Sequence, residues 1–224
     1  MRDWAQSALK KGVPLLAQEV VQGPDSNHWK VCVYLSPSGE LLRLLTLRKL
    51  RQHPPHFGIG SITETRDNAA LAALGKRYFE GLGYRGVGSA EFKLDTRDGR
   101  WKLIELNPRY WQQNAQATAA GSNFPLTQYM DLTGQVPPPD SGFFTGVKWV
   151  NIYMDFSSFL AYRREEGLGF IRWLASLRGR RTILSDFSLL DPGPFLHEIR
   201  YGAIFPRALW RIIRLIFRSP KPIR

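Results

Sequence analysis

The sequence predicts an α+β fold, in which pairs of strands lie on either side of one helix. Two observations support this prediction. Strand-like runs occur in two pairs, each joined by a short turn, and an amphipathic helical pattern separates the pairs. The chain has 224 residues, of which 43% are hydrophobic, so it can bury a sizeable core. We therefore expect one domain with an extension.

The first part of the chain reads as strands. Residues 13–25 form a short apolar run that ends in a Gly-Pro turn, which predicts a strand and a loop. Two further strands are expected at 29–35 and 40–47, because the residues between them, Pro37-Ser38-Gly39, favour a turn. These two strands would form an antiparallel pair.

Basic residues follow the strand expected at 40–47. Arg48, Lys49 and Arg51 precede a loop that contains Gly58 and Gly60. Cations at a strand end before such a loop suit a triphosphate, because ammonium and backbone donors can converge there. The alternative for each single cation is a solvated basic edge that discourages aggregation.

A helix is expected at residues 69–82. Asp67 or Asn68 can cap its first turn, and Gly83 can end it. Its apolar stripe should pack in the core and consists of Leu71, Leu74, Tyr78, Phe79 and Leu82.

A β-hairpin is expected at residues 87–107, because both halves alternate with a period of two around Arg97-Asp98-Gly99. A three-residue loop pairs Thr96 with Arg100, and counting back along the ladder then places Glu91 directly opposite Glu105. In the second strand, one face should carry Trp101, Leu103, Glu105 and Asn107.

The two glutamates of this hairpin predict a metal site. Carboxylates that face each other across a sheet repel unless a cation lies between them. Asn107 adds an amide oxygen on the face of Glu105, and carboxylate and amide oxygens are the hard ligands that Mg²⁺ prefers. Arg109 follows with a planar fork suited to phosphate or carboxylate. The alternative is a solvated strand face with incidental charges.

Helices and one more strand are expected in the rest of the chain. Residues 111–120 and 125–133 read as two helices. Three consecutive prolines at 137–139 favour an extended spacer and mark a boundary. Beyond them we expect a strand at 143–154 and a helix at 157–177 that glycines interrupt.

The C-terminal tail predicts a basic amphipathic helix. Between 205 and 218, apolar residues surround Arg207, Arg211, Arg214 and Arg218, at spacings of four, three and four. Such a helix can lie on an anionic membrane surface, and packing on a partner domain is the equal alternative. The net charge of +12 also predicts an acidic partner, which could be nucleotide, nucleic acid or anionic lipid.

Two absences in the sequence narrow the class of protein. Cys32 is the only cysteine, which excludes a disulfide within the chain and argues against a cysteine-based zinc site. No hydrophobic run is long enough to span a bilayer, and the N-terminus has no apolar signal core. We therefore expect a cytoplasmic protein, with peripheral membrane contact through 205–218 as an option.

The metal motif resembles that of the ATP-grasp superfamily of carboxylate-amine ligases. In that family an acidic residue on one strand and a Glu-x-Asn on the next hold the metal. The resemblance implies that Glu91, Glu105 and Asn107 bind Mg²⁺ or Mn²⁺, and that Arg109 is the arginine on the phosphate side.

The same resemblance implies an ATP site. The residues 18–21, which are Gln18, Glu19, Val20 and Val21, are similar to the hinge that binds adenine, and Asp25 would bind the ribose. In similar ligases a lysine contacts the phosphates, so Lys49 is the expected residue, with Arg48 and Arg51 as further candidates.

The resemblance covers roughly residues 15–134 and is limited to the C-terminal lobe of such ligases, an antiparallel sheet flanked by helices. It implies a lobe at 1–136, a mainly helical extension at 137–224, and an N-terminal lobe or partner subunit that completes the ATP clamp. The implied reaction converts a carboxylate to an acyl phosphate that an amine attacks. The alternative is a non-catalytic ATP-grasp module that docks to a membrane or partner through its basic helix; nucleic-acid binding is the weakest hypothesis.

Overall fold

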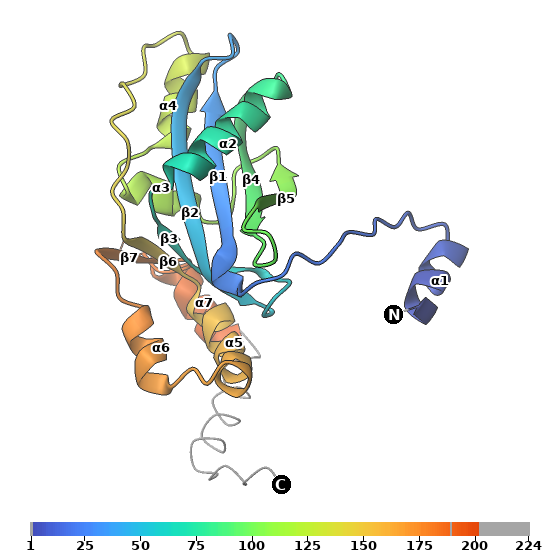
Figure 1. Ribbon diagram of the computed structural model, residues 1–224. Helices are drawn as coiled ribbons and strands as arrows, with labels where there is room; N and C mark the ends of the chain where they lie inside the picture. Colours follow the sequence, from blue (N-terminus) through green and yellow to red (C-terminus); the bar gives the residue numbers. More distant parts are fainter. Residues whose placement is uncertain (1, 189, 202–224) are drawn as a thin grey trace, which may run out of the picture.

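The computed structural model describes residues 2–188 and 190–201, and its centre is one seven-stranded sheet (Figure 1). The strand order is β5-β4-β1-β2-β3-β6-β7, and every neighbouring pair is antiparallel except β6 and β7. The expected α+β class is confirmed. The strands are β1 (His28–Leu35), β2 (Leu41–His53), β3 (Ile59–Thr65), β4 (Gly86–Leu94), β5 (Trp101–Asn107), β6 (Val147–Val150) and β7 (Arg181–Leu184).

Helices cover both faces of the sheet (Figure 1). Helix α2 lies on one face, and α3 and α4 lie on the other. The helical elements are α1 (Arg2–Lys10), the 3₁₀ turn η1 (Asp25–Asn27), α2 (Ala69–Gly81), α3 (Asn114–Ala119), α4 (Phe124–Leu132), α5 (Ile152–Glu165), α6 (Phe170–Ser176) and α7 (Gly193–Tyr201).

Strand β1 divides the core because its side chains alternate between the two faces. Val31 and Val33 pack against α2, whereas Cys32 and Tyr34 pack on the side of α3 and α4. By the same alternation, Lys30 belongs to the face of Cys32 and Tyr34. On that face, the C-terminal part of β1 is apolar and its N-terminal part carries the charge of Lys30.

Helix α2 agrees with the expectation at 69–82. Asn68 is its cap, since its side-chain oxygen accepts a hydrogen bond of 3.0 Å from the backbone nitrogen of Leu71. Leu71 and Phe79 of the expected stripe are fully buried, but Leu82 at the end of the helix is 57% exposed. The apolar stripe therefore predicted the buried face except at its last residue.

The second and third strands differ from the sequence prediction. Strand β2 continues to His53, so Arg48, Lys49 and Arg51 lie inside the strand and not at its end. Gly60, expected in a loop, belongs to strand β3, and no strand was expected there. The glycines there suggested a loop, yet β3 pairs with β2 and β6 on its two sides and is held by their ladders.

The segment after the three prolines returns to the same sheet. Strand β6 pairs with β3, and β7 pairs with β6, so the chain beyond 136 adds strands to the sheet as well as helices. The strand expected at 143–154 is shorter, and α5 begins at Ile152. The helix expected at 157–177 is interrupted at the glycines, as expected. It is divided into α5 and α6, because the chain turns at Gly167, where φ is +68°.

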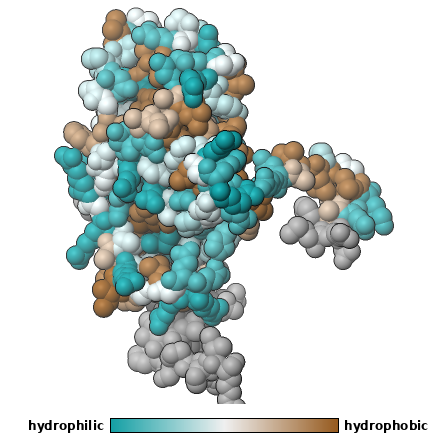
Figure 2. Space-filling model, viewed as in Figure 1, coloured by the Kyte–Doolittle hydropathy of each residue, from teal (hydrophilic) through white to brown (hydrophobic). Residues whose placement is uncertain are grey.

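The N-terminal segment lies apart from the body. Residues 13–22 form no strand, contrary to the prediction, and run as an extended arm to α1 (Figure 1). The arm touches the β4–β5 hairpin through few bonds, including 3.2 Å from the Thr96 nitrogen to the Gln22 oxygen. Apolar side chains of the arm face solvent, among them Leu16 at 85% exposure (Figure 2).

The basic helix expected at 205–218 lies outside the described residues. Among the helices that the structure describes, none is both long enough and apolar enough to cross a bilayer.

Candidate nucleotide and metal site

A cleft of about 640 Å³ opens on the face of the sheet opposite α2. Side chains from β1, β2, β4 and β5 form its floor, and the turn at 53–60 forms one wall. Trp111 lies between this cleft and the apolar core under α3 and α4. The cleft brings together five of the residues expected from the sequence, which are Lys49, Glu91, Glu105, Asn107 and Arg109.

Glu91 lies directly opposite Glu105, as expected, but the hairpin reaches this register by another route. The loop is longer than expected, because Leu94 pairs with Trp101 and the Asp95 nitrogen donates to the Arg100 oxygen at 2.9 Å. A β-bulge beside Glu91 then shifts the register back.

Because of the bulge, Trp101 does not share a face with Glu105, contrary to the expectation. Phe92 pairs with Leu103 and Glu91 with Glu105, so Ile104 is the extra residue on β5. The alternation of side chains is interrupted there, and Trp101 packs edge-on against Trp29 on the side of α2, with ring centroids 6.1 Å apart. Glu105 nevertheless shares the cleft with Glu91, because the two residues pair directly and the irregularity begins only after this pair.

Four charged side chains cross the floor of the cleft on adjacent strands. In strand order they are Lys49 on β2, Lys30 on β1, Glu91 on β4 and Glu105 on β5. Lys30 lies directly opposite Glu91, with 2.9 Å between Nζ and Oε1. Lys49 reaches the other oxygen of Glu91, with 2.6 Å between Nζ and Oε2. Lys30 was not among the residues expected at the site, since a lysine within an apolar strand gives no signal of its distant partner.

The two lysines keep Glu91 ionised. Burial alone would raise the pKa of its carboxyl group, but the charges and hydrogen bonds of Lys30 and Lys49 outweigh burial and lower the pKa to about 2. All three side chains are at most 9% exposed. They form a buried cluster, here called the Lys30–Glu91–Lys49 cluster, with one net positive charge.

Glu105 and Asn107 are the more accessible part of the site. Glu105 is exposed, and the Asn107 amide nitrogen donates to its Oε1 at 2.7 Å. The Glu105 carboxylate and the Asn107 amide are therefore neighbours, and both groups carry hard oxygen donors. Such a pair fits an octahedral ion that keeps several water ligands, as Mg²⁺ does. Within the described part of the chain, no three side chains of Asp, Glu, His or Cys lie close enough together to hold a metal ion among them.

Arg109 lies beyond the metal pair at the cleft edge. Its guanidinium is exposed and donates to the neighbouring backbone oxygen of Tyr110 at 3.1 Å. Most of its donors therefore remain available to an anion in the cleft.

His28 lines the cleft and was not anticipated as a site residue. Burial and the charges of Lys49 and Lys93 lower its pKa to about 4, so the ring is neutral at pH 7. Its buried Nδ1 has no hydrogen-bond partner among the described residues.

Two of the expected phosphate ligands lie outside the cleft. Arg48 donates to the backbone oxygen of Ser26 at 2.7 Å, and its guanidinium lies over the ring of Trp29. By the alternation of side chains along a strand, it lies on the opposite side of β2 from Lys49. Arg51 pairs with the fully buried Asp155 of α5, with 2.7 Å between Nη2 and Oδ2. Of the three cations expected at the phosphates, Arg48, Lys49 and Arg51, Lys49 lines the cleft.

Asp25, expected at the ribose, is buried beside the wall of the cleft and does not line it. Its Oδ2 accepts hydrogen bonds from the Tyr162 hydroxyl and, at 2.9 Å, from the backbone nitrogen of His56. Burial would raise the pKa of Asp25, but these bonds outweigh it and lower the pKa. The carboxylate thus joins the turn at 53–60 to α5.

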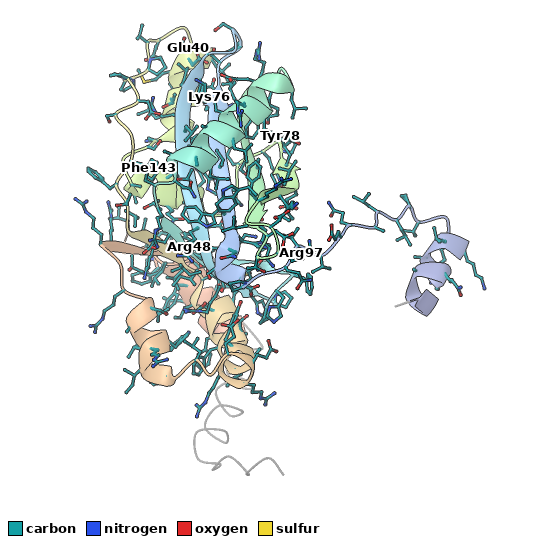
Figure 3. All side chains as sticks on the ribbon, viewed as in Figure 1. Glu40, Arg48, Lys76, Tyr78, Arg97 and Phe143 are labelled. Carbon is teal, nitrogen blue, oxygen red and sulfur yellow. The ribbon has the colours of Figure 1, made fainter. Side chains whose placement is uncertain are left out.

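The hinge residues expected at adenine lie along the hairpin and not in the cleft. Gln18 donates to the Ile104 oxygen at 3.4 Å, and Glu19 pairs with Arg97 at the base of the arm (Figure 3). Val20 is 53% exposed. Since Ile104 lines the cleft, the segment 18–21 runs beside the end of the cleft near β5.

Comparison with known proteins finds similarity over part of the chain. No protein-family model matches the chain. D-Aspartate ligase of Enterococcus faecium (strain Aus0004) is 25% identical over 111 residues, which cover 49% of this chain and 26% of that protein. The resemblance to the ATP-grasp superfamily is confirmed. This chain spans about a quarter of the length of the curated ATP-grasp relative it matches.

Solved structures that resemble the chain do so over part of its length. Biotin carboxylase from Campylobacter jejuni has a TM-score of 0.46 and 17% identity, over 58% of this chain and 30% of that one. The ATPase subunit of phosphoribosylaminoimidazole carboxylase from Aquifex aeolicus has a TM-score of 0.44 and 17% identity, over 57% and 38%.

Proposed function

We propose that this chain is the nucleotide- and metal-binding portion of an ATP- and Mg²⁺-dependent carboxylate-amine ligase. One observation carries the proposal: Lys49, Glu91, Glu105, Asn107 and Arg109, which come from different strands and a following loop, line a single cleft. The ATP-grasp resemblance supplies the reaction class. A carboxylate oxygen attacks the γ-phosphorus of ATP and releases ADP, and an amine then displaces phosphate from the acyl phosphate.

The side chains of the cleft suit phosphate binding and charge neutralisation. Lys30 and Lys49 present ammonium groups to the floor, and Arg109 presents a planar fork at the edge. Glu105 and Asn107 would hold the ion, which would supply positive charge to neutralise the phosphates. No nucleophilic side chain is required, because positioning and electrostatics carry phosphoryl transfer.

The chain's partial match to its curated relative bears on how the clamp is completed. Glu105 and Arg109 of the cleft are exposed, so phosphates bound beside them would keep contact with water. An N-terminal lobe or a partner subunit would cover them and strengthen each charge by excluding water. We propose that the carboxylate and the amine bind between the two parts.

Calorimetric titration of the chain with Mg-ATP tests the proposal, with Glu105→Ala as the site variant. Losing the exposed carboxylate should weaken Mg-ATP binding by about tenfold, the effect of one charged ligand. Asp98→Asn is the matched control, because Asp98 is an exposed acid of the same hairpin that pairs with Lys102 outside the cleft. Equal affinities for Glu105→Ala and Asp98→Asn would overturn the assignment.

A further inference from the structure

The carboxylate of Glu91 is fully engaged by protein cations. Lys30 lies 2.9 Å from Oε1 and Lys49 lies 2.6 Å from Oε2, so each oxygen has its own ammonium group. The Lys30–Glu91–Lys49 cluster is largely buried, since each of its side chains is at most 9% exposed. Glu105, directly opposite on β5, has no lysine or arginine within ion-pair distance among the described residues.

A divalent ion at Glu91 would have to displace at least one of these ammonium groups. A displaced lysine would remain on its strand within the cluster, where the positive ion would repel it. The displacement would also leave the ammonium group of that lysine nearly buried and without its carboxylate partner, which is strongly unfavourable. Glu105 and Asn107 present no such obstacle, because Glu105 is exposed and its hydrogen-bond partner is a neutral amide.

The same cluster is well arranged to bind an anion. Each ammonium group has three donor hydrogens, and Glu91 uses one from each lysine. Lys49 makes one further, long contact of 3.5 Å to the side chain of Gln52. Both lysines line the cleft, so their remaining donors can reach phosphate oxygens placed there.

We propose that Lys30 and Lys49 replace a divalent ion at Glu91. The cleft then holds its nucleotide through two ammonium groups and at most one metal ion, bound at Glu105 and Asn107. Glu91 orients the lysines and does not ligate metal, so it is a positioning residue. This inference rests on the proposed nucleotide site and specifies its metal requirement.

The two possible roles of Glu91 predict opposite effects of Glu91→Gln. If Glu91 ligates metal, the neutral amide should weaken the binding of metal and nucleotide together. If Glu91 only orients the lysines, its replacement by Gln takes a negative charge away from the phosphates. It also frees an ammonium hydrogen on one lysine, because the amide keeps a single acceptor oxygen. Binding of metal-free ATP should then become tighter, by about tenfold for one additional charge-assisted hydrogen bond.

Equilibrium binding of ATP to the whole chain, in EDTA and in Mn²⁺, measures both effects, and electron paramagnetic resonance counts the Mn²⁺ held with the nucleotide. We expect the wild type to hold a single Mn²⁺ per ATP, Glu91→Gln to keep it and bind metal-free ATP more tightly, and Glu105→Gln to lose it. Two Mn²⁺ per ATP in the wild type, or loss of Mn²⁺ from Glu91→Gln, would overturn this inference alone. A wild type that binds no ATP in either buffer would overturn the proposed function with it.

Lys30→Met provides an independent test, because it leaves Lys49 paired with Glu91 and no charge unpaired in the cluster. Its affinity for metal-free ATP should fall by about tenfold. The matched control is Lys102→Met, which removes the same charge from β5 but lies outside the cleft, where Lys102 pairs with Asp98. Circular dichroism confirms that each variant is folded. If Lys30→Met loses no more affinity than Lys102→Met, the lysines do not bind the phosphates and the inference fails.

Discussion

Lys30 and Glu91 face each other across β1 and β4, and their side chains form an ion pair of 2.9 Å. Glu91 in turn faces Glu105 across β4 and β5. The repulsion between these two carboxylates is therefore offset from the other side, by Lys30 and Lys49. A like-charged pair on adjacent strands indicates that a cation is near, but it does not tell whether that cation is a metal ion or a lysine.

A second buried ion pair holds the later part of the chain to the sheet. Asp155 of α5 is fully buried and accepts hydrogen bonds from Arg51 at 2.7 and 2.8 Å. It also accepts one of 2.9 Å from Ser61 and one of 2.8 Å from Trp173. We predict that Asp155→Ala lowers the free energy of unfolding by about 3–5 kcal/mol, because Arg51 would be left buried and unpaired.

Urea unfolding of Asp155→Ala checks this prediction. The control is Glu80→Ala, which breaks the exposed pair between Lys76 and Glu80, where the two groups are 3.7 Å apart. That change should stay within about 0.5 kcal/mol, as exposed helical pairs contribute little. A loss below about 1 kcal/mol for Asp155→Ala would mean that α5 is not held through this carboxylate.

The parts of the fold that local patterns encode could be predicted from the sequence. The period of two around 97–99 predicted the hairpin and the pairing of Glu91 with Glu105, and the apolar stripe with Asn68 predicted α2. The pairing was correct although the loop was not, since the bulge at Ile104 compensates for the longer loop. A bulge of this kind has no sequence signal beyond the alternation that it interrupts.

The parts that depend on distant partners could not be predicted. Lys49 and Arg51 were expected at the end of a strand, before a loop that contains glycines. Both are instead buried within β2, because Glu91 and Asp155 neutralise them. Arg51 and Asp155 are 104 positions apart, and only the folded sheet brings them together. Lys30 was missed for the same reason.

Gly75 gives a test of how tightly α2 packs on the sheet. A Cβ atom at this position would lie 2.6 Å from Cγ1 of Val31 on β1, which is closer than the two atoms can approach. We predict that Gly75→Ala destabilises the fold by about 1–3 kcal/mol, because α2 would have to move away from the sheet. Gly81→Ala, in the same helix with open space around it, should instead be neutral or stabilise by up to about 1 kcal/mol. Thermal unfolding of the two variants should shift in opposite directions, and a common direction would contradict the packing of α2.

His56 makes the wall of the cleft sensitive to pH. Its Nε2 lies 2.8 Å from Oε2 of Glu165, and its Nδ1 lies 3.4 Å from Oδ1 of Asp25. The hydrogen bond to Glu165 raises the pKa of His56 above its ordinary 6.5, and Asp25 adds to the effect against a smaller opposing contribution from burial. Protonated His56 therefore stabilises the fold fully below the pKa of the unfolded state, and this contribution is lost as the pH rises through the folded pKa.

We predict that the difference in unfolding free energy between the wild type and His56→Ala is larger at about pH 5.5 than at about pH 8.5. The difference should be at most about 1 kcal/mol, because His56 and Glu165 are both about half exposed. Asp25 stays ionised over this range, since its pKa is lowered from 3.8. Glu165→Gln should reduce the pH dependence, because it removes the largest cause of the raised pKa. Denaturant unfolding at both pH values measures the effect, and a larger difference at the higher pH would show that His56 is not charged in the folded protein.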